Sequence, residues 1–167
     1  MAEFLFITPA EMTSTTIMGG NADPDLYRLN IANVQLTVIE PLLGTTLYNK
    51  ILAEAESVTL AGDYLILYNK FIKPITKYQA LAEYATVAGF MLTNGGAFKH
   101  APDNAEIMTK DEKASVSQIY SGLADTYVIR FTKWIGLNPL TEYSTFQDEV
   151  NASTTITNTG GWYFGTD

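Results

Sequence analysis

The sequence predicts an all-α fold, a bundle of about five to six helices with an extended arm at each end. Apolar residues recur every three or four positions along the middle of the chain, and Pro and Gly punctuate that pattern. The net charge of −8 lies entirely in the two ends, because residues 1–27 and 138–167 each carry four acids and no Lys or Arg. The middle of the chain is neutral, with ten acidic and ten basic residues.

These patterns divide the 167 residues into three parts. Residues 1–21 are predicted to form an N-terminal arm with a short helix, residues 22–137 the helical bundle, and residues 138–167 an extended C-terminal arm. The length fits one domain with a core of its own. Arms that cannot bury themselves are typical of segments that contact other molecules.

The first helices begin at clear capping signals. Thr8 is placed to cap a short helix that has Pro9 at its first position, and Gly19-Gly20 would stop it. Asp23 and Pro24 then open a second helix, which Pro41 is expected to end. A third helix is predicted from about Thr45 to Glu56.

Gly62-Asp63 open a fourth helix, which Pro74 is expected to break or kink. A fifth helix is predicted from 75 to about 93, and Asn94-Gly95-Gly96 would end it. If the helix instead continued through Pro74, three lysines would share one face, as a contact for an acidic partner or simply as a solvated face. These lysines are Lys70, Lys73 and Lys77.

The sixth helix, roughly 110–135, has the most regular apolar stripe. We expect Tyr120, Leu123, Tyr127, Phe131 and Trp134 to form the spine of the bundle, against Tyr78, Ala82 and Ala85 of the fifth helix. A second apolar face on the same helix is explained either by a central place in its own bundle or by a subunit contact. It comprises Ala124, Val128, Ile129 and Ile135, of which Val128 and Ile135 are candidate interaction residues.

Past Gly136 the helical pattern ends, and the C-terminal arm has the composition of β or extended chain. Its aromatic residues Trp162, Tyr163 and Phe164 either fold back on their own domain, insert into a neighbouring subunit or partner, or stay disordered. With Phe4 and Phe6 of the N-terminal arm they complete the candidate interaction residues.

No group of residues indicates an enzyme. The chain has no Cys and a single histidine, His100, without the partners that a catalytic triad needs. Acids near 103–112 are expected to cap a helix start rather than to bind a cation. We therefore expect no catalytic residue, no metal site and no cofactor. No apolar run is long enough to cross a membrane, and the negative charge argues against gripping DNA through its phosphates.

Several short segments, in this order and spacing, carry a family resemblance: residues 6–8, 17–25, 41–48, 60–64 and 78–83. Together they resemble the head-tail connector (adaptor, head-completion) proteins of tailed phages and prophages, especially those of the Bacteroidetes and crAss-like group. The likeness covers roughly residues 5–137.

The resemblance implies a structural virion protein that forms a homo-oligomeric ring of about twelve subunits in the neck, between capsid and tail, after assembly in the host cytoplasm. Its implied partners are the portal protein and the next tail or adaptor protein, with DNA passing through the lumen without specific binding. The alternative is a helical binding module, an assembly chaperone or regulator, that forms no ring.

Overall fold

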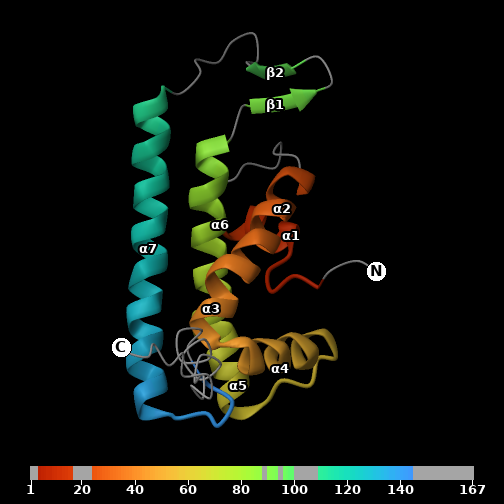
Figure 1. Cartoon of the computed structure of the whole chain (residues 1–167), viewed down its shortest axis with the longest axis vertical. Helices are drawn as coiled ribbons and strands as arrows, with labels where there is room; N and C mark the ends of the chain where they lie inside the picture. Colours follow the sequence, from red (N-terminus) through yellow and green to blue (C-terminus); the bar gives the residue numbers. More distant parts are fainter. Residues whose placement is uncertain (1–3, 17–23, 88–89, 94–95, 100–108, 145–167) are drawn as a thin grey trace, which may run out of the picture.

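The computed structural model describes residues 4–16, 24–87, 90–93, 96–99 and 109–144. Within these ranges the chain forms an all-α bundle with one short β-hairpin (Figure 1). The shorter helices are α1 (Pro9–Thr15), α3 (Glu40–Leu43) and α5 (Gly62–Leu67). The longer ones are α2 (Pro24–Val34), α4 (Thr45–Glu56), α6 (Lys73–Val87) and α7 (Lys110–Leu137), and the π-helical turns are η1 (Gln35–Ile39) and η2 (Tyr68–Ile72).

Two prolines lie inside continuous helices, which corrects the expectation that Pro41 ends the second helix. α2, η1 and α3 run on without a break, as do α5, η2 and α6. In each case the residue before the proline donates its N–H five residues back, Glu40 to the carbonyl of Gln35 and Lys73 to that of Tyr68. The wider π turn moves the proline ring away from the carbonyl four residues earlier, so the helix continues.

The first of these continuous helices ends at Leu43, two residues beyond Pro41, and Gly44 is its C-cap. Gly44 has φ 78° and ψ 154°, a backbone conformation that only glycine adopts without strain. The third helix then spans Thr45–Glu56 as predicted. The fifth is shorter than expected, because α6 ends at Val87 and a hairpin of β1 (Phe90–Thr93) and β2 (Gly96–Lys99) follows. These strands are antiparallel, with Phe90 opposite Lys99.

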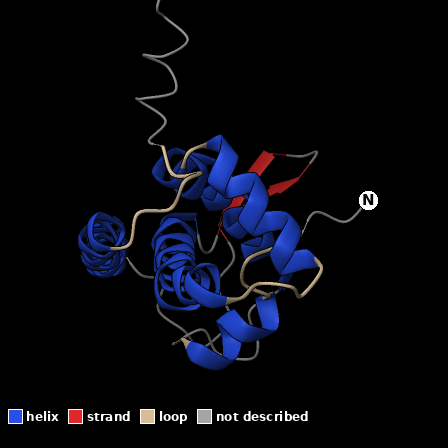
Figure 2. Ribbon diagram, turned by 90° about the horizontal axis from the view of Figure 1, so that it is seen from below, coloured by secondary structure: helices blue, strands red, loops and turns tan. Residues whose placement is uncertain are grey.

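Helix α6 lies at the centre of the molecule, with α7 on one side and α2 on the other (Figure 1). Helices α4 and α5 close the end opposite the hairpin, and the view from that end shows α7 beside α6 at the edge of the bundle (Figure 2). One continuous core joins these elements, and its members come from every described α-helix, from both π-helical turns and from the chain before α1. Its largest fully buried side chains include Phe6, Tyr27, Ile31, Ile39, Leu47, Ile51, Leu67, Ile72 and Phe131.

The sixth predicted helix is α7, and its start is fixed by a capping box between Thr109 and Glu112. The aromatic spine is confirmed in part, because Phe131 is fully buried and Tyr78 stacks on both Tyr120 and Tyr127. The prediction that Leu123 belongs to this spine is wrong, because its side chain is 40% exposed.

Ala124, one residue later and about 100° further round the helix, takes the buried position. Its small side chain permits the close approach of α7 to α6, whereas Leu123 lies at the edge of the contact. Ile135 is also buried within its own bundle, and Val128 packs against the same core. Burial in its own bundle therefore accounts for Ile135, whereas Val128 is partly exposed and stays a candidate interaction residue.

Candidate interaction surfaces

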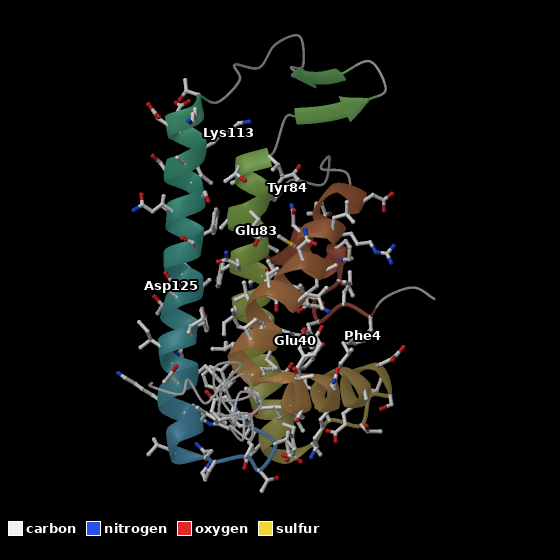
Figure 3. All side chains as sticks on the ribbon, viewed as in Figure 1. Phe4, Glu40, Glu83, Tyr84, Lys113 and Asp125 are labelled. Atoms are coloured by element: carbon white, nitrogen blue, oxygen red, sulfur yellow. The ribbon has the colours of Figure 1, made fainter. Side chains whose placement is uncertain are left out.

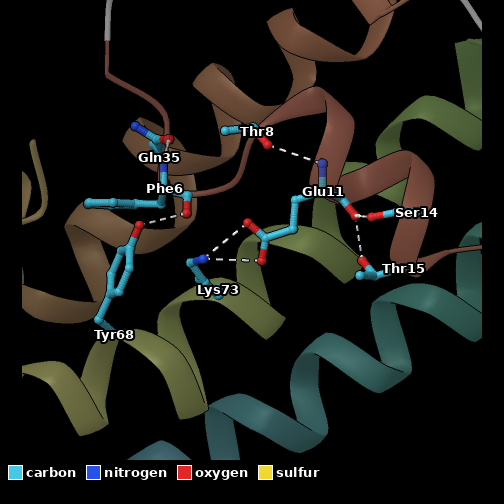
Figure 4. Close-up of polar contacts among 8 residues, drawn as sticks. All are labelled: Phe6, Thr8, Glu11, Ser14, Thr15, Gln35, Tyr68 and Lys73. Atoms are coloured by element: carbon cyan, nitrogen blue, oxygen red, sulfur yellow. Dashed lines mark hydrogen bonds and ion pairs between the residues drawn. The ribbon is translucent and has the colours of Figure 1, made fainter.

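The chain before α1 is bonded into the bundle by the first residues of the two π turns. The Phe6 N–H donates to Gln35 Oε1 at 2.7 Å, and Gln35 Nε2 donates to the Phe4 carbonyl at 3.1 Å. The Tyr68 hydroxyl donates to the Phe6 carbonyl at 2.9 Å (Figure 4). Burial raises the pKa of Tyr68 to about 12, which keeps this donor protonated.

The Phe6 ring lies inside the core, which corrects its assignment as a residue on a free arm. It is 1% exposed and meets the rings of Tyr48 and Tyr68 edge-on, at centroid distances of 5.6 and 5.8 Å. Phe4 is half-buried and packs edge-on against Phe6. The physical reason is that an apolar segment of this size gains more by filling the space between the two π turns than by staying in water.

Helix α1 is held in the same place by an ion pair. Lys73 Nζ lies 3.0 Å from one carboxylate oxygen of Glu11 and 3.1 Å from the other (Figure 4). Residues 4–16 therefore belong to the bundle, and the predicted N-terminal arm of 1–21 is largely part of the folded domain. The rest of that range, residues 1–3 and 17–21, lies outside the described residues.

The chain after α7 is anchored by one carboxylate. Glu142 accepts from Lys50 Nζ at 2.6 Å with one oxygen and from the Tyr64 hydroxyl at 2.7 Å with the other. The hydrogen bond from Lys50, followed by that from Tyr64, lowers the pKa of Glu142 to about 2. The next residue, Tyr143, packs edge-on against Phe131. Residues 138–144 are thus part of the bundle as well.

A set of cations and aromatic rings lies on the contact between α6 and α7, and we call it the cation–aromatic face: Lys77, Tyr78, Tyr120, Tyr127 and Arg130. Tyr78 stacks on Tyr120 and Tyr127 at centroid distances of 6.5 and 5.7 Å. Lys77 Nζ lies 5.0 Å from the Tyr78 centroid, and the Arg130 guanidinium 5.1 Å from that of Tyr127. All three rings are partly exposed, so the face is open to a ligand or partner.

The lysines singled out in the sequence separate into two groups. The helix does continue through Pro74, but Lys73 is used internally by Glu11. Lys70 and Lys77 make no ion pair with any residue that the structure describes. Lys77 is therefore the member of the group that remains available on the cation–aromatic face.

Exposed apolar side chains form two further surfaces. On α2 and η1, Leu29 is 68% exposed and Leu36, seven residues on, lies on the same side of the helix. On α7, Leu137 is 83% exposed, and Ile119 and Leu123 are exposed too. The two helices that carry these side chains, α2 and α7, flank α6 on opposite sides (Figure 1), and Figure 3 shows side chains along the outer side of α7, where Asp125 is labelled.

Chemistry-bearing groups are sparse in the described part of the chain. It holds no cluster of three acidic or histidine side chains that could bind a metal, and none of its helices is long and apolar enough to cross a membrane. The predicted contact residues Trp162, Tyr163 and Phe164, and the lone His100, lie outside the described residues.

Sequence reasoning missed Gln35, Tyr68, Lys50 and Glu142. One signal for Gln35 was present, because it is a polar residue between Val34 and Leu36 in an apolar helical stretch. A buried polar side chain in that position needs partners, and backbone groups of another segment supply them. No comparable signal marks Glu142.

Residues 39–160 match the model of a family described as a family of unknown function, DUF6712. No curated protein and no solved structure is significantly similar to the chain. The matched range includes Glu142 and Tyr143, which anchor residues 138–144, and the whole cation–aromatic face. It begins after Gln35.

Proposed function

We propose that this chain, which belongs to the DUF6712 family, is a structural virion protein: a subunit of a head-tail connector ring that docks on the portal and joins the capsid to the tail. The ring would let DNA pass through its lumen. The family itself has no known function, so the proposal rests on the resemblance of the short segments and on the surfaces of the bundle.

The observation that supports it most is the pair of exposed apolar surfaces on opposite sides of α6. One comprises Leu29 and Leu36, the other Ile119, Leu123 and Leu137. A subunit of a closed ring needs two different surfaces, one for each neighbour, because its contacts are head-to-tail. A two-fold dimer would need only one.

The charge of the chain agrees with a DNA channel. A net charge of −8 repels the phosphate backbone, so a lumen lined by this protein would let the genome slide without binding it.

Electron cryomicroscopy of the virion tests the proposal directly. We expect the protein as a ring in the neck, bound to the outer end of the portal. A protein found only in infected cells and never in particles would contradict the connector function and favour the assembly chaperone.

A thiol cross-linking experiment tests the two surfaces without the particle, and it is simple because the chain has no Cys. The double variant Leu29→Cys, Leu123→Cys should give a ladder of oligomers with a short bifunctional maleimide under assembly conditions. Each single variant is the matched control and should stay monomeric. Dimers from a single variant would indicate a two-fold contact and contradict a ring.

A further inference from the structure

We infer that the cation–aromatic face binds the acidic, aromatic C-terminal segment, residues 145–167, of a second copy of this chain. The inference rests on the proposed function in one respect, namely that neighbouring copies meet in an assembly.

The acceptor surface is ordered before anything binds to it. The three stacked rings of Tyr78, Tyr120 and Tyr127 come from two packed helices, so their positions are fixed by the fold. Burial raises the pKa of Tyr120, as expected for a ring already partly removed from water. A rigid aromatic surface loses little conformational entropy when a partner packs on it.

The two cations of this face form no ion pair within the described part of the subunit. Lys77 lies over the central ring of the stack, Tyr78, and Arg130 lies over Tyr127. By contrast, Lys50 and Lys73, which also lie near tyrosine rings, are both paired with glutamates. The face therefore presents two unneutralised cations on an aromatic surface, which suits a ligand with carboxylates and aromatic rings.

The C-terminal segment has the complementary chemistry. Residues 145–167 contain Asp148, Glu149 and Asp167, no Lys or Arg, and the run 162–164 of Trp, Tyr and Phe. Aromatic anchors and charge pairs of this kind are typical of the residues that dominate binding energy. At about 3.3 Å per residue, such a segment can extend some 75 Å, enough to reach an adjacent subunit.

The placement of Ser144 favours a second copy over the segment's own subunit. Glu142 is bonded to Lys50 and Tyr64, and Tyr143 packs on Phe131, so the segment starts on the side of α7 that faces the core. Arg130 lies about 100° round the helix from Phe131, toward the outer edge of the contact with α6. The segment would have to turn back around α7 to reach the face of its own subunit, and this favours the face of a neighbour.

Isotope-mixed photo-cross-linking of the full chain tests this. Trp162 is replaced by the photoreactive p-benzoylphenylalanine in ¹⁵N-labelled protein, which is mixed with unlabelled protein at up to about 1 mM, the effective concentration of a tethered segment in an assembly. We expect cross-linked peptides that join the labelled segment to unlabelled α6 or α7.

The variant Lys77→Glu, Arg130→Glu, placed in the unlabelled copy, should reduce this mixed-isotope product about tenfold. The variant Arg28→Glu, Lys110→Glu makes the same two charge changes on exposed residues elsewhere and should leave the yield unchanged. Circular dichroism of both variants confirms that they are folded.

Four outcomes would overturn the inference: products within one chain only, products on another surface, equal yields from both charge variants, or no mixed-isotope product at all. Each is separate from the proposed function, because a ring seen in the virion neck would stand even if the segment bound elsewhere. Conversely, specific trans binding by a protein absent from virions would remove the connector proposal and retain this contact.

Discussion

The two ends of the described chain are both anchored to the bundle, but by different physical means. The segment at 4–7 is held by neutral hydrogen bonds between its backbone and buried or partly buried side chains, and it inserts a fully buried ring. The segment at 138–144 is held by the edge-on contact of Tyr143 with Phe131 and by the ion pair of Glu142 with Lys50, whose two side chains remain about a quarter to a third exposed. Two ends with the same acidic composition therefore differ in how strongly they belong to the fold.

The difference follows from what water can replace. When a buried bond to the backbone is lost, the freed group finds no water and keeps its full desolvation cost. When the exposed pair at Glu142 is lost, water solvates both charges, and salt screens them in any case. The N-terminal segment is thus a structural element, while the anchor at Glu142 sets the direction in which the C-terminal segment leaves the bundle.

The largest effect is expected from Phe6→Ala. Removing a ring that is fully buried against Tyr48 and Tyr68 should lower the free energy of unfolding by about 3–5 kcal/mol. Phe4→Ala is the matched control, and since Phe4 is only half-buried it should cost about 1 kcal/mol. Urea denaturation measures both. Equal small losses would mean that the segment at 4–7 does not belong to the core.

The next largest effect is expected from Gln35→Leu. The substitution keeps the size of the side chain but leaves the Phe6 N–H and the Phe4 carbonyl without their partner, and it should cost about 2–3 kcal/mol. Tyr68→Phe removes a single bond to the Phe6 carbonyl and should cost about 1 kcal/mol. If Gln35→Leu were neutral in the same denaturation assay, the hydrogen bonds to the segment could not be what holds it.

Much of the fold was predictable because it depends on local signals. Caps such as Thr8 and the apolar period of α7 act over three or four residues, and they gave the helix positions closely. The prolines were misjudged because their effect depends on the turn before them. A π turn at Gln35 or at Tyr68 relieves the clash, and nothing in the local sequence marks it.

The interaction surfaces were less predictable because they depend on which faces the packing leaves uncovered. The periodicity of α7 could not decide between Leu123 and Ala124 for the buried position, since the two differ by only one step on the helix. Likewise, the availability of Lys77 follows from the pairing of Lys73 with a residue 62 positions away. Contacts between distant parts of the chain decide such questions, and one sequence does not contain them in readable form.

A smaller effect is expected at the C-terminal anchor, and it depends on pH. The pKa of Glu142 is lowered from its usual 4.5 to about 2, so its contribution to stability is complete above about pH 4.5 and is lost as the pH falls toward 2. Glu142→Gln should remove this part of the acid dependence of the melting temperature. Glu112, whose pKa is lowered by its bonds to Thr109, titrates in both proteins and cancels in the difference. A difference that does not change between pH 5 and pH 2 would contradict the anchor.

The smallest effect on stability is expected from deleting residues 152–167. This deletion tests whether the chain beyond the anchor at Glu142 contributes to the stability of its own subunit. The deletion leaves both anchors intact, because Glu142 and Tyr143 precede it. It removes Trp162, Tyr163 and Phe164, which we expect to pack on a second copy rather than on their own subunit. The melting temperature of the isolated subunit should therefore stay almost unchanged, while incorporation into particles falls.

The full-length variant Lys77→Glu, Arg130→Glu is the matched control, because it should impair assembly in the same way with the segment still present. Strong destabilisation of the truncated subunit alone would instead place the three aromatic residues in its own core and remove the distinction between the two ends.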